Sequence, residues 1–204
     1  VNFSANVIKG HKTGYFLDHR ANRKEVGKWS KGKTVLDVFS YAGGFSVHAL
    51  VGGAQEVTSL DISKQALEVA KYNASLNGDY NNYMTVAGDA FAEMKEMAQS
   101  SRKFDLIVVD PPSFAKKASE IPAAINSYKR LVKRTIPLAS KGAVLVFASC
   151  SSRIRPEAFY ELIEGALRNH RVKYSVLEST GHDCDHPVTF YEGRYLKTIY
   201  IQLK

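Results

Sequence analysis

The stretch that decides the fold is Thr34-Val-Leu-Asp-Val-Phe-Ser-Tyr-Ala-Gly-Gly-Phe45. Its first half, Thr34–Phe39, is apolar and rich in β-branched residues, which predicts a strand. The glycines Gly43 and Gly44 let the chain turn tightly into a helix that we expect to run to Val51. Glycines here also let a ligand approach the backbone, and the first N–H groups of the helix can bind a carboxylate or a phosphate. An ordinary glycine-rich turn without a ligand is the simpler alternative.

Short β-rich runs and longer amphipathic stretches continue to alternate on both sides of this unit. Further strands are predicted at Glu56–Asp61, Tyr83–Ala87, Phe104–Asp110 and Ala143–Ala148. Helices are predicted at Arg20–Trp29, from the N-cap Ser63 to Gly78, and at Ala90–Gln99, Ile121–Ser140 and Pro156–His170. We expect Pro137 to end or kink the helix that contains it. Alternating apolar residues also predict a half-buried strand over residues 1–7.

The last two strands, Val172–Glu178 and Tyr195–Leu203, are too close together for a crossover helix and predict an antiparallel hairpin. Strand-then-helix units followed by a hairpin favour an α/β fold, a doubly wound, mostly parallel, Rossmann-like sheet of about seven strands. In such sheets ligands bind outside the carboxyl ends of the strands. The residues that follow each strand are therefore the candidates for a functional site.

Composition bounds the class of protein. The chain has 204 residues, a formal net charge of +8 and two cysteines, which suits one globular domain without a disulfide framework. No apolar run approaches the ~18 residues of a membrane span, so we expect a cytoplasmic protein with no membrane partner. The positive charge favours an anionic partner or is merely a basic surface. Because the chain begins at Val1, we expect it to be a piece of a longer protein or a processed chain.

Acidic residues end three of the predicted strands. Asp61 follows the second strand and can accept hydrogen bonds from a ribose diol, while Asp89 and Phe91 follow the third and could hold an adenine. Each of these residues, taken singly, also has an ordinary structural explanation. Together with Asp37 they suit a nucleoside cofactor that needs no pyrophosphate site.

The ends of the fourth and fifth strands carry a different chemistry. Asp110-Pro-Pro-Ser-Phe114 predicts a rigid loop that would expose carbonyl groups and an aromatic ring to a planar, amino-bearing substrate, and a simple chain reversal is the alternative. Cys150 lies among serines and before Arg153 and Arg155, which could lower the pKa of its thiol and favour the thiolate. An inert core cysteine is the alternative. The other thiol, Cys184, lies between two histidines whose spacing matches no common zinc site, so no metal is expected.

These motifs, in their order along nearly the whole chain, resemble those of the class I S-adenosylmethionine-dependent RNA methyltransferases. The segment Lys12-Thr-Gly-Tyr-Phe-Leu-Asp-His-Arg20 narrows the resemblance to the family of the bacterial 23S rRNA (cytosine-5)-methyltransferase I. The family pattern has Gln where this chain has His19. The resemblance implies an enzyme that methylates C5 of a cytosine in large-subunit ribosomal RNA, with S-adenosylmethionine as cofactor.

The resemblance also implies site residues. Cys150 would be the nucleophile, and Asp110 a hydrogen-bond partner of the pyrimidine. The cofactor would be bound by Thr13, Tyr15, Asp18, Arg20, Asp37, Ser40, Ala42, Gly43, Gly44, Asp61, Ile62, Asp89, Ala90 and Phe91. The substrate would be bound by Pro111, Pro112, Phe114 and Arg23. Residues 1–30 would form an N-terminal strand and one side of the cleft, and residues 31–204 the methyltransferase domain.

Members of this family usually carry an RNA-binding domain ahead of the catalytic domain, and we expect this chain to correspond to the part that follows such a domain. Its basic residues would then supply the phosphate contacts, the candidates being Lys12, Arg20, Arg23, Lys24, Lys116 and Lys117. Two other functions stay open: a guanine-N7 methyltransferase, which needs no thiol, and a non-catalytic RNA-binding module that keeps the fold. The sequence names neither the base that removes the C5 proton nor the oligomeric state.

Overall fold

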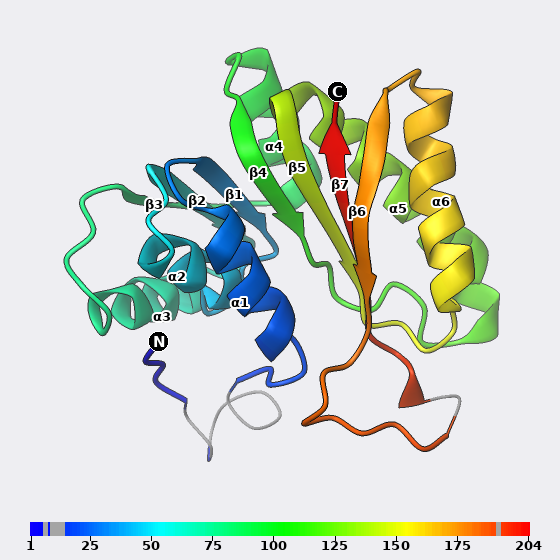
Figure 1. Ribbon diagram of the computed structural model, residues 1–204, viewed down its shortest axis with the longest axis horizontal. Coiled ribbons are helices and arrows are strands. Elements are labelled where there is room, and N and C mark those ends of the chain that lie inside the picture. The colour runs from blue at the N-terminus through cyan, green and yellow to red at the C-terminus, as the bar shows by residue number, and fades with distance from the viewer. Residues whose placement is uncertain (6–7, 9–14, 191–192) are drawn as a thin grey trace. The chain divides into compact units, whose positions relative to one another are not determined.

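The computed structural model describes residues 1–5, 8, 15–190 and 193–204 (Figure 1). The chain divides into two compact units, Val1–Ala90 and Phe91–Lys204. Strands and helices alternate through both units, as the sequence predicts. The predicted division at residue 30 stays a prediction.

The first unit is built on three parallel strands, β1 (Thr34–Val38), β2 (Glu56–Asp61) and β3 (Tyr83–Ala87). They lie in the order β3-β2-β1, so all three carboxyl ends meet at one edge. Apart from their first residues and Asp61, β1 and β2 are buried throughout, and the buried positions include the polar residues Asp37, Thr58 and Ser59. This arrangement brings the residues that follow the three strands together.

Three helices accompany these strands, α1 (Arg20–Trp29), α2 (Gly44–Val51) and α3 (Lys64–Ser75) (Figure 1). The hydroxyl of Ser63 caps α3 by accepting a hydrogen bond from the N–H of Ala66 at 3.1 Å, as expected. The helix ends at Ser75 rather than at Gly78 because Asn77 turns out of it, its N–H donating to the carbonyl of Ala74 at 2.9 Å.

The predicted strand over residues 1–7 is wrong for residues 1–5, and residues 6 and 7 lie outside the described residues. The segment pairs with side chains of the α3 region instead of with a strand. The N–H of Asn2 donates to the side-chain oxygen of Asn77 at 2.7 Å, and the N–H of Ser4 to that of Asn73 at 2.9 Å. Asparagine side chains thus satisfy the backbone donors that a neighbouring strand would otherwise have satisfied.

The second unit holds the four strands β4 (Phe104–Val109), β5 (Ala139–Ser149), β6 (Tyr174–Thr180) and β7 (Lys197–Leu203). Their order is β4-β5-β7-β6. The β4–β5 pair is parallel, and β7 is antiparallel to both β5 and β6. The predicted C-terminal hairpin is therefore confirmed, with β7 inside the sheet and β6 at its edge.

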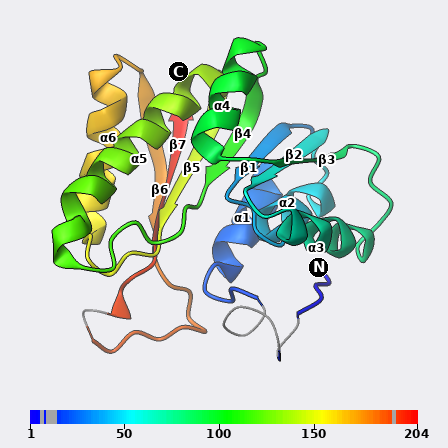
Figure 2. The same ribbon diagram turned by 180° about the vertical axis from the view of Figure 1, so that it is seen from behind.

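The helices of the second unit are α4 (Ala90–Gln99), α5 (Ile121–Thr135) and α6 (Pro156–Asn169), with short 3₁₀ turns η1 (Ala118–Glu120) and η2 (Ile136–Leu138). Figure 2 shows α4 and α5 in front of β4 and β5. Pro137 ends α5 as expected. The predicted helix to Ser140 is too long, because the 3₁₀ turn around Pro137 leads directly into β5 at Ala139.

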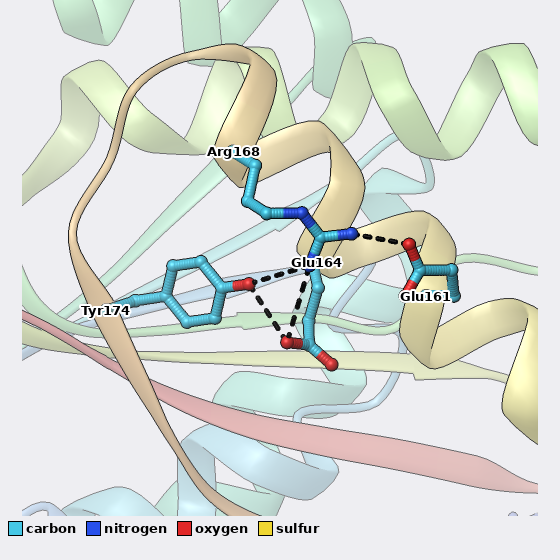
Figure 3. Close-up of polar contacts among 4 residues, drawn as sticks. All are labelled: Glu161, Glu164, Arg168 and Tyr174. Carbon is cyan, nitrogen blue, oxygen red and sulfur yellow. Dashed lines mark hydrogen bonds and ion pairs between the residues drawn. The ribbon is translucent and has the colours of Figure 1, made fainter.

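A polar cluster ties the edge strand β6 to α6 (Figure 3). The guanidinium of Arg168 donates to Glu161 and, at 3.3 Å, to the hydroxyl of Tyr174. That hydroxyl donates to Glu164 at 2.9 Å. An edge strand exposes unpaired backbone groups, and this cluster holds one side of β6 against the helix.

The strand and helix order confirms the predicted fold class, a doubly wound α/β sheet of seven mostly parallel strands with antiparallel strands at its C-terminal end. Among the described residues, no helix has the length and apolarity that crossing a membrane requires.

Candidate active site

The turn between β1 and α2 has an unusual backbone. Phe39, Tyr41 and Gly43 all have positive φ angles, of 66°, 48° and 78°. Residues other than glycine rarely adopt positive φ angles, and such backbone strain concentrates at binding sites. The N–H groups of Phe39 and Ser40 both donate to the carbonyl of Leu60, at 2.9 and 3.1 Å, which fastens the turn to the end of β2.

Gly43 is required by space as well as by its backbone angle. A Cβ atom at this position would lie 2.9 Å from the Cβ of Ala70 in α3. Asn73 in α3 also supports the turn by donating to the carbonyl of Ala42 at 2.9 Å. The turn is therefore shaped by α3, which the local sequence pattern does not reveal.

Asp37 starts a buried chain of hydrogen bonds. One of its oxygens accepts from the N–H and the hydroxyl of Ser46, at 3.0 and 2.7 Å. The chain continues through the hydroxyl of Ser59 to that of Tyr83, with oxygen–oxygen distances of 2.5 and 2.7 Å. Burial, opposed by the bond to Ser59, raises the pKa of Tyr83 to about 12. Asp37 thus stabilises the start of α2, a role that sequence reasoning missed.

Asp61 braces the site with both oxygens. One accepts from the N–H of Tyr41 at 2.8 Å and the other from the N–H of Ser63 at 2.9 Å. A carboxylate offers about four acceptor positions, so Asp61 can hold the turn and still accept from a ribose hydroxyl. The structure therefore places Asp61 beside the turn, while its neighbour Ile62 is exposed.

The surroundings of this turn fit S-adenosylmethionine. The hydroxyl of Ser40 is buried and has no hydrogen-bond partner among the described residues. Gly44 and Phe45 begin α2, and the first N–H groups of a helix lack acceptors within it. The donors at the start of α2, the Asp61 carboxylate and the buried Ser40 hydroxyl are thus chemically suited to a carboxylate, a ribose diol and an amino group.

The segment before α1 packs against the same turn. Arg23 is 4% exposed, and its guanidinium lies 4.3 Å from the ring centre of Tyr15 and beside Gly44. Burial, opposed by Arg23, raises the pKa of Tyr15 to about 12. Asp18 is buried and Arg20 exposed, whereas Thr13 and Lys12 lie outside the described residues. Arg23 is therefore placed to support the turn rather than to meet phosphate at the surface.

The residues after β3 are divided between the units. Asp89 is exposed and Ala90 is buried, both at the end of the first unit. Phe91 begins the second unit, where the guanidinium of Arg130 lies 4.3 Å from its ring centre. One face of the Phe91 ring is thus covered by a cation, which the sequence did not suggest.

Cys150 follows β5 in the second unit and is partly exposed, with its thiol free of a disulfide. The serines on either side, Ser149 and Ser151, are fully buried. The hydroxyl of Ser149 accepts from that of Tyr128 at 2.9 Å, and the hydroxyl of Ser151 donates to the carbonyl of Ala115 at 2.9 Å. Buried neighbours therefore fix the backbone on both sides of the partly exposed Cys150.

The loop after β4 meets this segment. Its Ala115 carbonyl receives the Ser151 bond, and the ring of Phe114 lies edge-on to that of Tyr128, 5.1 Å between centres. Pro111 is buried and Pro112 exposed. Burial raises the pKa of Tyr128, and the charges of Cys150 and Asp110 raise it further. The structure therefore places Asp110, Phe114 and Cys150 around Tyr128, and their roles in a reaction stay a prediction.

Sequence reasoning missed Lys197, the buried cation of this region. It is fully buried at the start of β7, and its amine donates to the carbonyl of Ser151 and, at 3.0 Å, to that of Tyr195. Arg153 and Arg155, which we expected beside the thiol, are exposed. A lysine opening an otherwise apolar strand was the signal available in the sequence.

Two further features lie apart from these residues. A cavity of about 610 Å³ between α5 and α6 is lined by other side chains, including Arg153 and Arg155. In the part of the chain that the structure describes, no three His, Cys, Asp or Glu side chains are grouped so as to hold a metal ion.

Comparison with known proteins places these observations in a family. Residues 1–180 match the family model described as S-adenosylmethionine-dependent methyltransferase. The "Ribosomal RNA large subunit methyltransferase" of Deinococcus radiodurans is 41% identical over 202 residues, which are 98% of this chain and 50% of the relative. The "Ribosomal RNA large subunit methyltransferase I" of Aeromonas salmonicida is 37% identical over 100% of this chain and 52% of its own length.

Among solved structures, SMU.776, crystallised in complex with SAH, superposes with a TM-score of 0.85 at 28% identity. The match covers 95% of this chain and 51% of that one. This chain thus spans about half the length of the relatives it matches.

Proposed function

The chain belongs to the S-adenosylmethionine-dependent methyltransferase family, and from this premise we propose that it methylates C5 of a cytosine in large-subunit ribosomal RNA. The names of the relatives support ribosomal RNA as the substrate. The observation that carries the cytosine-5 chemistry is Cys150, a partly exposed thiol held between buried serines beside the Asp110–Phe114 loop.

We assign most of the cofactor contacts to the turn of the first unit. Asp61 accepts from the ribose, the free hydroxyl of Ser40 reaches the methionine portion, and the N–H groups at Gly44 meet its carboxylate. Asp89, Ala90 and Phe91 take the adenine. Thr13, Tyr15, Asp18, Arg20, Asp37, Ala42, Gly43 and Ile62 complete the proposed set. When bound, S-adenosylmethionine supplies an electrophilic methyl group.

The Cys150 thiol would overcome the low nucleophilicity of C5 of cytosine. C5 of cytosine is a poor nucleophile, whereas addition of the Cys150 thiolate to C6 moves electron density onto C5. After C5 has gained its methyl group, loss of the C5 proton expels the thiolate and restores the aromatic ring. A methyltransferase acting on a ring nitrogen needs no such thiol.

The loop after β4 positions the base. Phe114 and the two prolines Pro111 and Pro112 offer a rigid apolar edge, and Asp110 hydrogen-bonds the edge of the pyrimidine. The exposed cations Arg20, Lys24, Lys116 and Lys117 contact phosphates. Arg23, which is buried, acts on the substrate only through Tyr15 and the turn.

The test is identification of the product. The chain is incubated with large-subunit ribosomal RNA that lacks its natural methylation and with labelled S-adenosylmethionine, and the digested nucleosides are analysed by mass spectrometry. We expect 5-methylcytidine. Labelled 7-methylguanosine would overturn the assignment in favour of the guanine-N7 reaction.

Two cysteine variants sharpen this test. Cys150→Ala removes the nucleophile and should abolish labelling while leaving the binding of S-adenosylhomocysteine within a few-fold. Cys184→Ala removes the exposed thiol and is the matched control, expected to keep activity. Wild-type rates in Cys150→Ala would refute the thiol adduct.

A further inference from the structure

Lys197 lies where an uncompensated charge would not be expected. Its side chain is fully buried, and burying an ammonium costs free energy unless the charge is compensated. The two acceptors that it has are backbone carbonyls, which carry only partial negative charge. A neutral donor would serve the same two carbonyls, so hydrogen bonding alone does not account for a charged side chain at this position.

The side chain of Lys197 extends toward the segment that contains Cys150. On β7, Lys197 is paired with Ser149 of β5. Its amine nevertheless reaches the carbonyl of Ser151, two residues further along. The side chain therefore runs alongside the segment Ser149–Ser151, of which Cys150 is the middle residue.

Charged and titratable groups of this region come from α5, the loop after β4, the segment after β5, and β7. Tyr128 of α5 interacts with both Cys150 and the carboxylate of Asp110 after β4. Asp110 disfavours a thiolate, and Tyr128 is neutral at ordinary pH because burial raises its pKa. Arg153 and Arg155 are exposed, where water and salt weaken their effect. Lys197 on β7 is the buried cation of the group.

We propose that Lys197 is a positioning residue that fixes the loop carrying Cys150 through the Ser151 carbonyl and, by its charge, favours the thiolate form of the nucleophile. The inference rests on the proposed function, in which Cys150 attacks the base. It adds to the proposed site a residue on β7 that contacts the segment of Cys150 through the Ser151 carbonyl.

The protonation state of Lys197 agrees with this role. Burial lowers its pKa to about 8, and the neighbouring Cys150 raises it. The amine is therefore mostly charged at pH 7, and the attraction that favours the ammonium favours the thiolate equally. Because Lys197 is fully buried and donates to two carbonyls, it is not placed to take the C5 proton from a substrate.

The experiment measures thiol ionisation without RNA or cofactor. Purified protein is alkylated with iodoacetamide between pH 5 and 10, and mass spectrometry follows the peptides of Cys150 and Cys184 separately. Cys184 is exposed and serves as the reference thiol in the same molecule. The variants are Lys197→Met, which removes the charge, and Lys197→Arg, which keeps it. Arg168→Met removes an exposed cation from the same unit as a control.

In the wild type, we expect the midpoint of the alkylation rate against pH to be at least about one pH unit lower for Cys150 than for Cys184. In Lys197→Met, alkylation of Cys150 at pH 7 should slow about tenfold or more. Lys197→Arg and Arg168→Met should leave it near the wild-type rate, and Cys184 should be unchanged throughout. Circular dichroism verifies that each variant is folded.

Coincident Cys150 profiles in wild type and folded Lys197→Met would overturn the proposal. If Lys197→Met does not fold, the wild type alone still tests the proposal. Equal dependence of the alkylation rate on pH for Cys150 and Cys184 would also overturn it. Neither result touches the proposed function, which is tested separately by the methylated product.

Discussion

At the scale of single residues, Asp61 has a structural role in the β1–α2 turn and a proposed role in binding the ribose. Its two oxygens accept from the N–H groups of Tyr41 and Ser63, so it shapes the strained turn in addition to the ribose contact that we propose for it. The sequence could suggest the second role from the position of Asp61 after a strand. It could not suggest the first, because positive φ angles at Phe39 and Tyr41 leave no mark on residue type.

We predict that Asp61→Ala weakens the binding of S-adenosylhomocysteine at least about tenfold, since charge-assisted hydrogen bonds contribute about 1.5–3 kcal/mol. Isothermal titration calorimetry measures the change. Asp79→Ala removes an exposed carboxylate of the same unit and should bind as the wild type does. Unchanged affinity in Asp61→Ala would refute the ribose assignment.

Lys197 makes a prediction about stability and pH. Its pKa in the folded protein is lowered to about 8 from the ordinary 10.5, so between these values the unfolded chain binds more protons than the folded one. Stability relative to Lys197→Met should therefore rise with pH from about 8 to 10.5, by at most about 1.4 kcal/mol per pH unit. Tyr15 and Tyr83, with pKa values raised to about 12, act in the opposite direction above pH 10.

Urea unfolding of wild type and Lys197→Met at pH 7.0 and 9.5 isolates the contribution of Lys197, because the tyrosines are common to both proteins. A difference in unfolding free energy that is the same at both pH values would show that the lysine titrates normally.

At the scale of elements, the most accurate predictions were those set by local chemistry. The bounds of α1 and β2 agree with the sequence pattern, and Ser63 caps α3 as expected. The errors arose where a distant partner decides. Residues 1–5 alternate like a strand, yet Asn73 and Asn77 take up their backbone donors. Lys197 opens β7 like any surface lysine, yet pairing with β5 buries it.

Two glycines test how α3 shapes the turn. Gly43→Ala forces an alanine into positive φ and brings its Cβ to 2.9 Å from Ala70. Gly32→Ala has nearly the same angle, +69°, but nothing within 4 Å of the added atom. We expect Gly32→Ala to cost about 1–2 kcal/mol of unfolding free energy, and Gly43→Ala about 1–3 kcal/mol more. Equal losses of unfolding free energy in the two variants, measured by urea unfolding, would mean that α3 moves away from the added Cβ at no cost.

At the scale of the whole molecule, the residues proposed for the reaction come from both units. Most of the residues proposed to bind the cofactor belong to Val1–Ala90, and the proposed nucleophile Cys150 and the residues that contact its segment belong to Phe91–Lys204. The sequence predicted the parallel strands after which these candidate residues stand, and ligands collect at the carboxyl ends of such strands, but it did not predict the division into two units. It does not name the base that the proposed reaction would methylate, and the chain spans about half the length of its relatives.

The two cysteines of the chain allow a direct test of the central claim, that Cys150 forms a covalent adduct with the target cytosine. In RNA that carries 5-fluorocytosine, fluorine replaces the C5 proton whose loss would release the thiolate, so the adduct should be trapped. We predict a protein–RNA complex that survives denaturation, depends on S-adenosylmethionine, and maps by mass spectrometry to Cys150. A complex through Cys184, or none while unmodified RNA is methylated, would contradict the account.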